Sequence, residues 1–195
     1  KNGYHVVLRN LETKKEDTLK FVTHFTFAKK GKSFAYSSSG MDDESDAAVF
    51  VKNLENGQTQ NIHNAKKGKY FQLEFSESGE NLGFVVDADT TKIQIRPNEL
   101  FHWKEGASKA EKLVDIETAP EGYLVSEDGK ISFSKDESKL FFGLRQPPII
   151  KDTTLTNDEI VNVEVWTYDE PRLYTVQELD LKKDTVRSYQ TVIQL

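Results

Sequence analysis

Three copies of one hairpin pattern constrain this chain more than any other feature of its sequence. The segments Phe25–Tyr36, Leu73–Phe84 and Ile131–Phe142 align without gaps, and each reads apolar-x-Phe-(Ala/Ser), a polar turn, then apolar-x-aromatic. Alternation of apolar and polar residues on both sides of a short polar turn predicts a β-hairpin. Glu137 stands where the first two copies have glycine, so we expect the third turn to differ or to carry backbone strain.

Each repeated hairpin is followed by a second pair of strand-like segments. These pairs cover residues 49–54 and 59–62, 100–103 and 110–114, and 173–181 and 186–189, with a similar pair at 4–11 and 17–19. The hairpins recur after 48 and then 58 residues (Phe25 to Leu73 to Ile131). An all-β unit with a period of about 40–50 residues is typical of propeller blades.

The pattern therefore predicts an all-β fold, a partial (open) β-propeller of about three to four four-stranded antiparallel blades. We expect a single propeller fragment over residues 1–195, with a blade remnant at 1–20 and blades at about 21–64, 70–116 and 123–195. Only residues 107–113 and 157–161 could tolerate a turn of helix. The chain opens inside the regular pattern, so we interpret it as a piece of a longer protein. An open array exposes an apolar face at each end, and self-association of the fragment through end-blade faces or edge strands is expected.

The composition excludes several classes of partner. The chain has 26 Lys+Arg against 32 Asp+Glu residues, a formal net charge of -6, whereas phosphate binding needs a basic face; no nucleic-acid partner is expected. The absence of cysteine excludes disulfides and cysteine-based metal sites, but assigns no compartment. No apolar stretch approaches the ~18 residues of a membrane helix, so no membrane span is expected.

Four histidines and two acidic segments are the residues that could suggest a metal site. None of the histidines has a ligand spacing such as His-x-x-x-His, so a structural or surface role is expected for His5, His24, His63 and His102. The acidic loop Asp42–Asp46 lacks the glycine and terminal glutamate of a calcium-binding EF-hand loop, and Asp87–Asp89 is interpreted as a turn. We expect no metal site and no cofactor.

Aromatic residues at one repeat position point to packing between blades. Phe27, Phe75 and Phe133 recur there, and a residue that recurs in every repeat usually serves the core, where we also expect Trp103 and Trp166. The long connection Arg145–Val161 is different, because it contains Pro147 and Pro148 and shows little periodicity. It is interpreted as a plain insertion or, alternatively, as a loop that lines the propeller mouth or contacts a further domain.

The repeats Phe-x-Phe-Ser-x-x-x-x-x-Leu-x-Phe resemble the propeller of the prolyl oligopeptidase family of serine peptidases, and also TolB-like propellers. A more distinctive block lies between Leu140 and Leu181. It contains Leu-Phe-Phe-Gly-Leu-Arg-Gln-Pro-Pro at 140–148, Asp158-Glu159, Val-Glu-Val-Trp-Thr-Tyr at 163–168 and Leu-Tyr-Thr-Val-Gln at 173–177. This block is similar to one blade of the long bacterial members of that family, which include dipeptidyl and acylaminoacyl peptidases.

The resemblance implies a propeller that gates or positions peptide substrate for an α/β-hydrolase domain, which follows the propeller and carries the catalytic Ser, Asp and His. The strings nearest to the nucleophile elbow Gly-x-Ser-x-Gly are Gly31–Ala35, inside a blade hairpin, and Gly106–Ala110, in a loop. We therefore assign no catalytic residue and expect no enzyme activity from this chain.

By this resemblance the parent protein is a serine peptidase whose partners are a peptide substrate and a C-terminal hydrolase domain. The resemblance also implies a periplasmic or secreted location, whereas the sequence itself does not exclude a cytoplasmic one. The alternative is a TolB-like binding or scaffold propeller with no enzymatic partner domain, which the generic repeats fit equally well.

Overall fold

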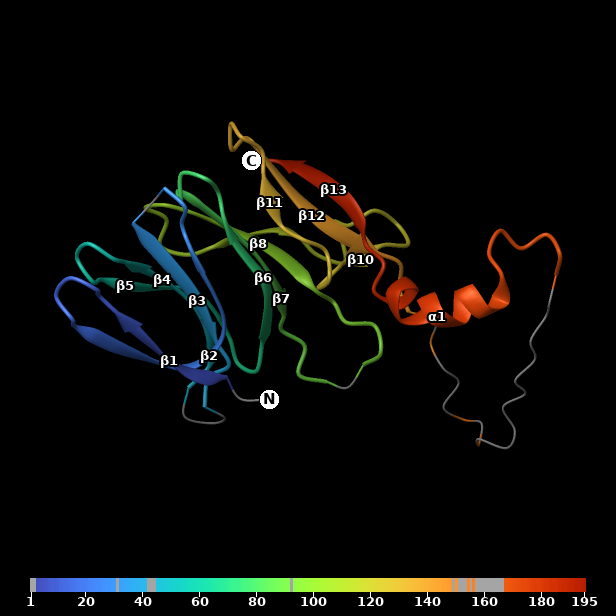
Figure 1. The fold of residues 1–195 in the computed structure, drawn as a ribbon, viewed down its shortest axis with the longest axis horizontal. Coiled ribbons are helices and arrows are strands. Elements are labelled where there is room, and N and C mark those ends of the chain that lie inside the picture. The colour runs from blue at the N-terminus through green and yellow to red at the C-terminus, as the bar shows by residue number, and fades with distance from the viewer. Residues whose placement is uncertain are drawn as a thin grey trace.

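The computed structural model describes residues 3–30, 32–41, 45–91, 93–148, 150, 154, 156 and 167–195. Within these ranges the chain forms three antiparallel sheets, which follow one another across the molecule in chain order (Figure 1). No strand of the first sheet pairs with a strand of the third in the described part, so the array is open. The fold is mostly β, with sheets of four or five strands like the blades of an open propeller.

The first sheet contains five strands in chain order, and its second strand is shared between two hairpins. The strands are β1 (Tyr4–Arg9), β2 (Glu16–Phe27), β3 (Ser33–Ser38), β4 (Ala47–Asn53) and β5 (Thr59–Ala65). β1 pairs with residues 16–22 of β2, whereas β3 pairs with residues 22–27 of it. The segment expected as a separate blade remnant therefore extends the sheet of the first blade.

The second sheet is a four-stranded meander in the middle of the array. Its strands are β6 (Lys69–Phe75), β7 (Asn81–Asp87), β8 (Glu99–Lys104) and β9 (Glu111–Val114), in that order. Both of its faces are covered, because alternate residues along a strand point to opposite faces. Phe84 and Val86 pack toward the first sheet with Val49, and Val85 packs toward the third sheet with Leu140. The main apolar cores thus lie between successive sheets.

The third sheet is built around β12 (Lys139–Arg145). The short strands β10 (Leu124–Val125) and β11 (Ser132–Phe133) both pair with β12, and β13 (Tyr189–Gln194) pairs with it as well. The repeated hairpin is confirmed here, since Phe133 pairs with Leu140. The second strand pair predicted at residues 173–181 and 186–189 is not formed. Instead, β13 pairs directly with β12.

The segment 173–181, predicted as a strand, is helical, and this prediction was wrong. Helix α1 spans Tyr174–Thr185, and the following strand begins at Tyr189 instead of residue 186. The run Gln-Glu-Leu-Asp-Leu-Lys-Lys consists mostly of good helix formers, and Lys182 and Lys183 place positive charge in the last turn, where the helix dipole favours it. No residue of α1 is buried, so no sheet of the described residues supplies the packing that favours a strand.

The repeated phenylalanines lie at equivalent positions but in different surroundings. Phe75 is buried between the first and second sheets, and Phe133 packs partly buried between the second and third. Phe27 is 49% exposed, so the prediction that it lies in the core was wrong. This repeat position faces the preceding sheet, and no sheet precedes the first one in the described residues. Trp103 is buried as predicted, whereas Trp166 lies outside the described residues.

Several predicted features fall on residues that the structure does not describe. They include residues 42–44 of the acidic loop and residues 157–161, where a turn of helix was conceivable. They also include Asp158, Glu159 and residues 163–166 of the distinctive block. Residues 107–113, where a helical turn was conceivable, contain a bend and the first residues of strand β9. Among the described residues no helix is both long and apolar enough to cross a membrane.

Candidate functional site

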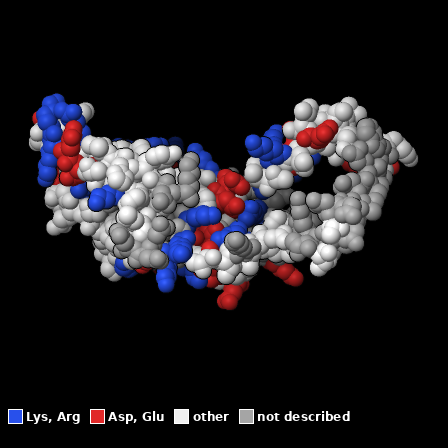
Figure 2. All heavy atoms as spheres, turned by 90° about the horizontal axis from the view of Figure 1, so that it is seen from below, with Lys and Arg blue, Asp and Glu red and all other residues white. Residues whose placement is uncertain are grey.

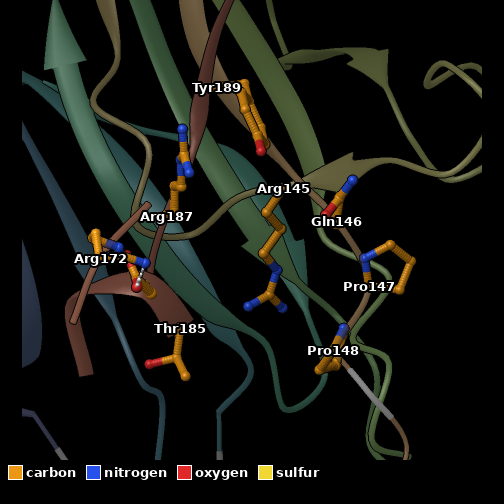
Figure 3. A pocket seen from close by; sticks show the side chains of 9 residues that line it. Arg145, Gln146, Pro147, Pro148, Arg172, Thr185, Arg187 and Tyr189 are labelled. Carbon is orange, nitrogen blue, oxygen red and sulfur yellow. Dashed lines mark hydrogen bonds and ion pairs between the residues drawn. The ribbon is translucent and has the colours of Figure 1, made fainter. Parts of the chain in front are cut away.

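A cationic pocket, which we call the arginine pocket, lies where β12 ends. It has a volume of about 600 Å³ and is bounded by the end of β12, the segment before α1, the last turn of α1, and the chain that leads from α1 into β13 (Figure 3). Its lining residues are Arg145, Gln146, Pro147, Pro148, Arg172, Asp184, Thr185, Arg187 and Tyr189. Three guanidinium groups against one carboxylate give this lining a surplus of positive charge.

Arg145 is the last residue of β12, and its position follows from the local sequence. Pro147 and Pro148 have no N–H to donate to a sheet, so the strand ends before them. The Arg145 backbone pairs with Leu124, and its Nη1 lies 3.0 Å from Oε1 of Glu127. Its side chain is only 15% exposed, and its buried Nε has no hydrogen-bond partner in the described part of the chain.

Glu127 is itself held by a side chain from β6 and by one from the residue that precedes β8. The buried amide of Asn98 donates to Glu127 Oε2 at 2.7 Å and to the Val125 carbonyl at 3.1 Å. Gln72 Nε2 donates to the Glu127 carbonyl at 3.0 Å. Burial raises the pKa of the neighbouring Asp128, and the charge of Glu127 adds to that effect. These contacts fix the partner of Arg145 and thereby hold its guanidinium in place.

The other two arginines of the pocket differ in their partners. Arg172 forms ion pairs with Asp184 at 2.7 Å and Asp180 at 3.4 Å, and its hydrogen bond lowers the pKa of Asp184. The Arg187 guanidinium lies 5.4 Å from the centre of the Tyr189 ring, a cation–π contact. Arg187 forms no ion pair with any described residue. Figure 2 shows that positively and negatively charged side chains also lie next to one another elsewhere on one face, with Lys and Arg beside Asp and Glu.

The four histidines lie apart from the arginine pocket. His63 Nδ1 is 3.0 Å from the Tyr70 hydroxyl, and burial, helped by the charge of Lys109, lowers the pKa of His63 to about 4. His102 Nε2 donates to Asn81 Oδ1 at 2.9 Å, and burial lowers its pKa. His5 and His24 contact phenylalanine rings. The described residues contain no group of three or more His, Asp or Glu side chains that could hold a metal ion.

The remaining segments considered from sequence serve the fold. Asp87 is buried and accepts two hydrogen bonds from Arg96, both at 2.8 Å, which ties the turn after β7 together. Ser33 begins strand β3, and Ser108 lies in the turn between β8 and β9. Neither serine stands at a strand-to-helix turn, the place that a nucleophile elbow requires.

Sequence reasoning did not find the arginine pocket. Arg145, Arg172 and Arg187 are widely separated in the chain, and no local motif connects them. One signal was present, because the long connection that starts at Arg145 was interpreted as a possible lining of the propeller mouth. Of that connection, residues 145–148 contribute to the pocket wall.

No known protein family and no curated protein matches the sequence. Among solved structures, the chain resembles prolyl endopeptidase at 16% identity, covering 78% of this chain and 26% of the other, with a TM-score of 0.47. The β-propeller domain of the Trilobed protease from Pyrococcus furiosus, described as having an open velcro topology, is similar at 15% identity over 73% of this chain and 56% of the other, with a TM-score of 0.34. An oligogalacturonate lyase in complex with manganese is similar at 13% identity over 69% and 34%, with a TM-score of 0.44.

This chain spans between a quarter and just over half of the length of those three proteins. The resemblance is structural and of low identity, and it includes propeller proteins of different activities. The fold class therefore follows from the three antiparallel sheets of the chain itself.

Proposed function

We propose that this chain is the non-catalytic propeller portion of a serine peptidase, and that it gates or positions peptide substrate for an α/β-hydrolase domain elsewhere in the same protein. The observation that carries the proposal is the position of the arginine pocket. It lies at the end of β12, and five of its nine lining residues, Arg145–Pro148 and Arg172, belong to the block that resembles peptidases of the prolyl oligopeptidase family.

The chemistry of the described residues supports a binding role over a catalytic one. A serine nucleophile needs an adjacent general base and an oxyanion hole, arranged around a place for the reacting carbonyl. The arginine pocket offers positive charge, proline rings and a tyrosine, which can hold a ligand, and its lining contains neither a serine nor a histidine. Any peptide hydrolysis by the parent protein would then come from residues outside this chain.

The test uses the parent protein. An antibody raised against this chain captures the parent from its source, and its mass and its labelling by a fluorophosphonate serine-hydrolase probe are measured. We expect a protein several hundred residues longer than this chain, labelled outside the segment that corresponds to it. A short parent that takes no label would overturn the proposal and leave a TolB-like binding or scaffold propeller.

A further inference from the structure

Among the described residues, Arg145 and Arg172 of the arginine pocket are paired with carboxylates, whereas Arg187 is not. Asp180 and Asp184 balance Arg172, and Glu127 balances Arg145. Of these three carboxylates only Asp184 lines the pocket, and no described residue forms an ion pair with Arg187. A concave site with one sign of charge in excess concentrates ligands of the opposite sign. The pocket is therefore suited to an anion.

Arg145 determines which kind of anion fits. Its Nη1 is engaged by Glu127, which Asn98 holds in turn, so the guanidinium is fixed before any ligand arrives. Its Nε is buried and lacks a hydrogen-bond acceptor among the described residues. The planar fork of a guanidinium matches the two oxygens of a carboxylate. Figure 3 shows this guanidinium extending into the space between Thr185 and Pro148.

The remaining walls suit an organic ligand better than a bare ion. The rings of Pro147 and Pro148 lie on one side of the pocket, and the Tyr189 ring on another (Figure 3). Apolar walls with a few fixed polar groups are the usual lining of small-molecule sites, whose volumes are ~300–1,000 Å³. The volume of about 600 Å³ falls within that range.

We propose that the arginine pocket binds a carboxylate group of a peptide, with Arg145 as the fork that grips it and Arg187 as a second positive charge. The inference rests on the proposed function for the peptide nature of the ligand. The carboxylate can be the C-terminus of the peptide or the side chain of an acidic residue, because both present the same two oxygens to a guanidinium.

Calorimetric titration of the 195-residue chain with four short peptides separates these sources. The peptides are acetyl-Ala-Ala-Ala with a free C-terminus, the same peptide as its amide, acetyl-Ala-Glu-Ala-amide and acetyl-Ala-Gln-Ala-amide. We expect at least one acid to bind tenfold or more tightly than its neutral counterpart. Preference for the free C-terminus or for the glutamate peptide identifies the source of the carboxylate. Equal binding of acids and neutral peptides, or no binding, overturns the inference.

Three variants show whether the binding occurs in this pocket. Arg145→Lys keeps a positive charge beside Glu127 but removes the fork, and should weaken carboxylate binding at least tenfold. Arg187→Gln breaks no ion pair with a described residue, so it should leave the fold intact and weaken binding severalfold. Arg9→Gln, at an exposed ion pair with Glu16 outside the pocket, should bind as the native chain does.

Circular-dichroism melting of each variant establishes that it is folded, and Arg187→Gln keeps the test decisive if Arg145→Lys is unstable. Native-like binding by both pocket variants would overturn the inference. The titration needs no hydrolase domain. If it shows no carboxylate binding, the proposed function is still tested separately by the fluorophosphonate probe experiment. Conversely, an unlabelled parent would overturn the proposed function while carboxylate binding by this chain could still be observed.

Discussion

The carboxylate of Glu137 accepts a hydrogen bond of 2.9 Å from the side-chain amide of Asn81, which joins the turn of the third hairpin to the second sheet. Ser78 adds two more hydrogen bonds to the same carboxylate, from its N–H and its hydroxyl, both of 2.8 Å. Glu137 has φ of +56°, the left-handed region that disfavours residues other than glycine. The predicted strain in this turn is confirmed, and the contacts to the neighbouring sheet explain how a glutamate is tolerated there.

Replacing Glu137 by glutamine should destabilise the contact between the second and third sheets. The amide has only one acceptor oxygen and no charge, so the hydrogen bonds from Ser78 and Asn81 cannot all be kept. We expect the free energy of unfolding in urea to fall by about 1–3 kcal/mol. Glu77→Gln is the matched control, since Glu77 stands in the corresponding turn of the second hairpin and pairs only at the surface with Lys30. Equal decreases in the free energy of unfolding for both variants would show that the hydrogen bonds to Glu137 stabilise the fold no more than a surface ion pair does.

The same variant should change how stability depends on acid. Burial raises the pKa of Glu137, but the hydrogen bonds from Ser78, Ser76 and Asn81 outweigh that effect and lower it from 4.5 to about 2. A carboxylate with a lowered pKa in the folded state stabilises the fold above its unfolded pKa and loses that contribution as pH falls. The stability difference between the native chain and Glu137→Gln should therefore be complete above about pH 4.5 and shrink toward pH 2. A difference that stays constant over this range would contradict the assignment.

His63 should make the fold sensitive to mild acid. Its pKa falls from 6.5 to about 4 on burial, so the unfolded chain binds a proton at a pH where the folded chain does not. The stability contributed by neutral His63 is complete above about pH 6.5 and is lost as pH decreases to about 4. We expect thermal melts of His63→Gln to lose less stability over this range than melts of the native chain. The exposed His5→Gln variant should keep the native dependence, and a parallel curve for His63→Gln would refute the prediction.

The pair formed by Asp87 and Arg96 should contribute more to stability than the ion pairs on the surface. The Asp87 side chain is 5% exposed and that of Arg96 is 23% exposed, so little water replaces their contact when it is broken. Asp87→Asn should lower the free energy of unfolding by about 2–3 kcal/mol. Glu55→Gln, in the exposed pair with Lys32, should cost less than about 1 kcal/mol. Denaturation midpoints that shift equally for the two variants would count against this ranking.

The outer face of the first sheet should make the isolated chain self-associate. Phe25 is 54% exposed and Phe27 is 49% exposed on this face, where they contact Phe34 and each other. Light scattering at increasing concentration should show species larger than a monomer, and the double variant Phe25→Lys/Phe27→Lys should shift them toward the monomer. Leu11→Lys, at an exposed turn, should have no such effect. A clean monomer at high concentration would contradict the prediction.

The repeated hairpins are the part of the fold that local sequence was sufficient to predict. Alternation with period two on either side of a polar turn specifies both strands and their shared face, and the pairs Phe25–Tyr36, Phe75–Leu82 and Phe133–Leu140 are formed as expected. The segment 174–185 shows the limit of such reasoning. Its spaced apolar residues resemble a strand, but its composition favours a helix, and because none of its residues is buried the intrinsic preference decides.

The sequence by itself determined the strand pattern, the blade-like period and the lack of a nucleophile elbow, because each depends on residues close together in the chain. Only the tertiary structure decided that Phe27 is exposed while its counterpart Phe75 is buried, since burial depends on whether another sheet covers that face. Likewise, Arg145 and Arg187 meet around one pocket only because β13 returns to pair with β12. The positively charged lining of the arginine pocket and the unpaired Nε of Arg145 arise from contacts between segments distant in the chain. No local sequence pattern predicts them.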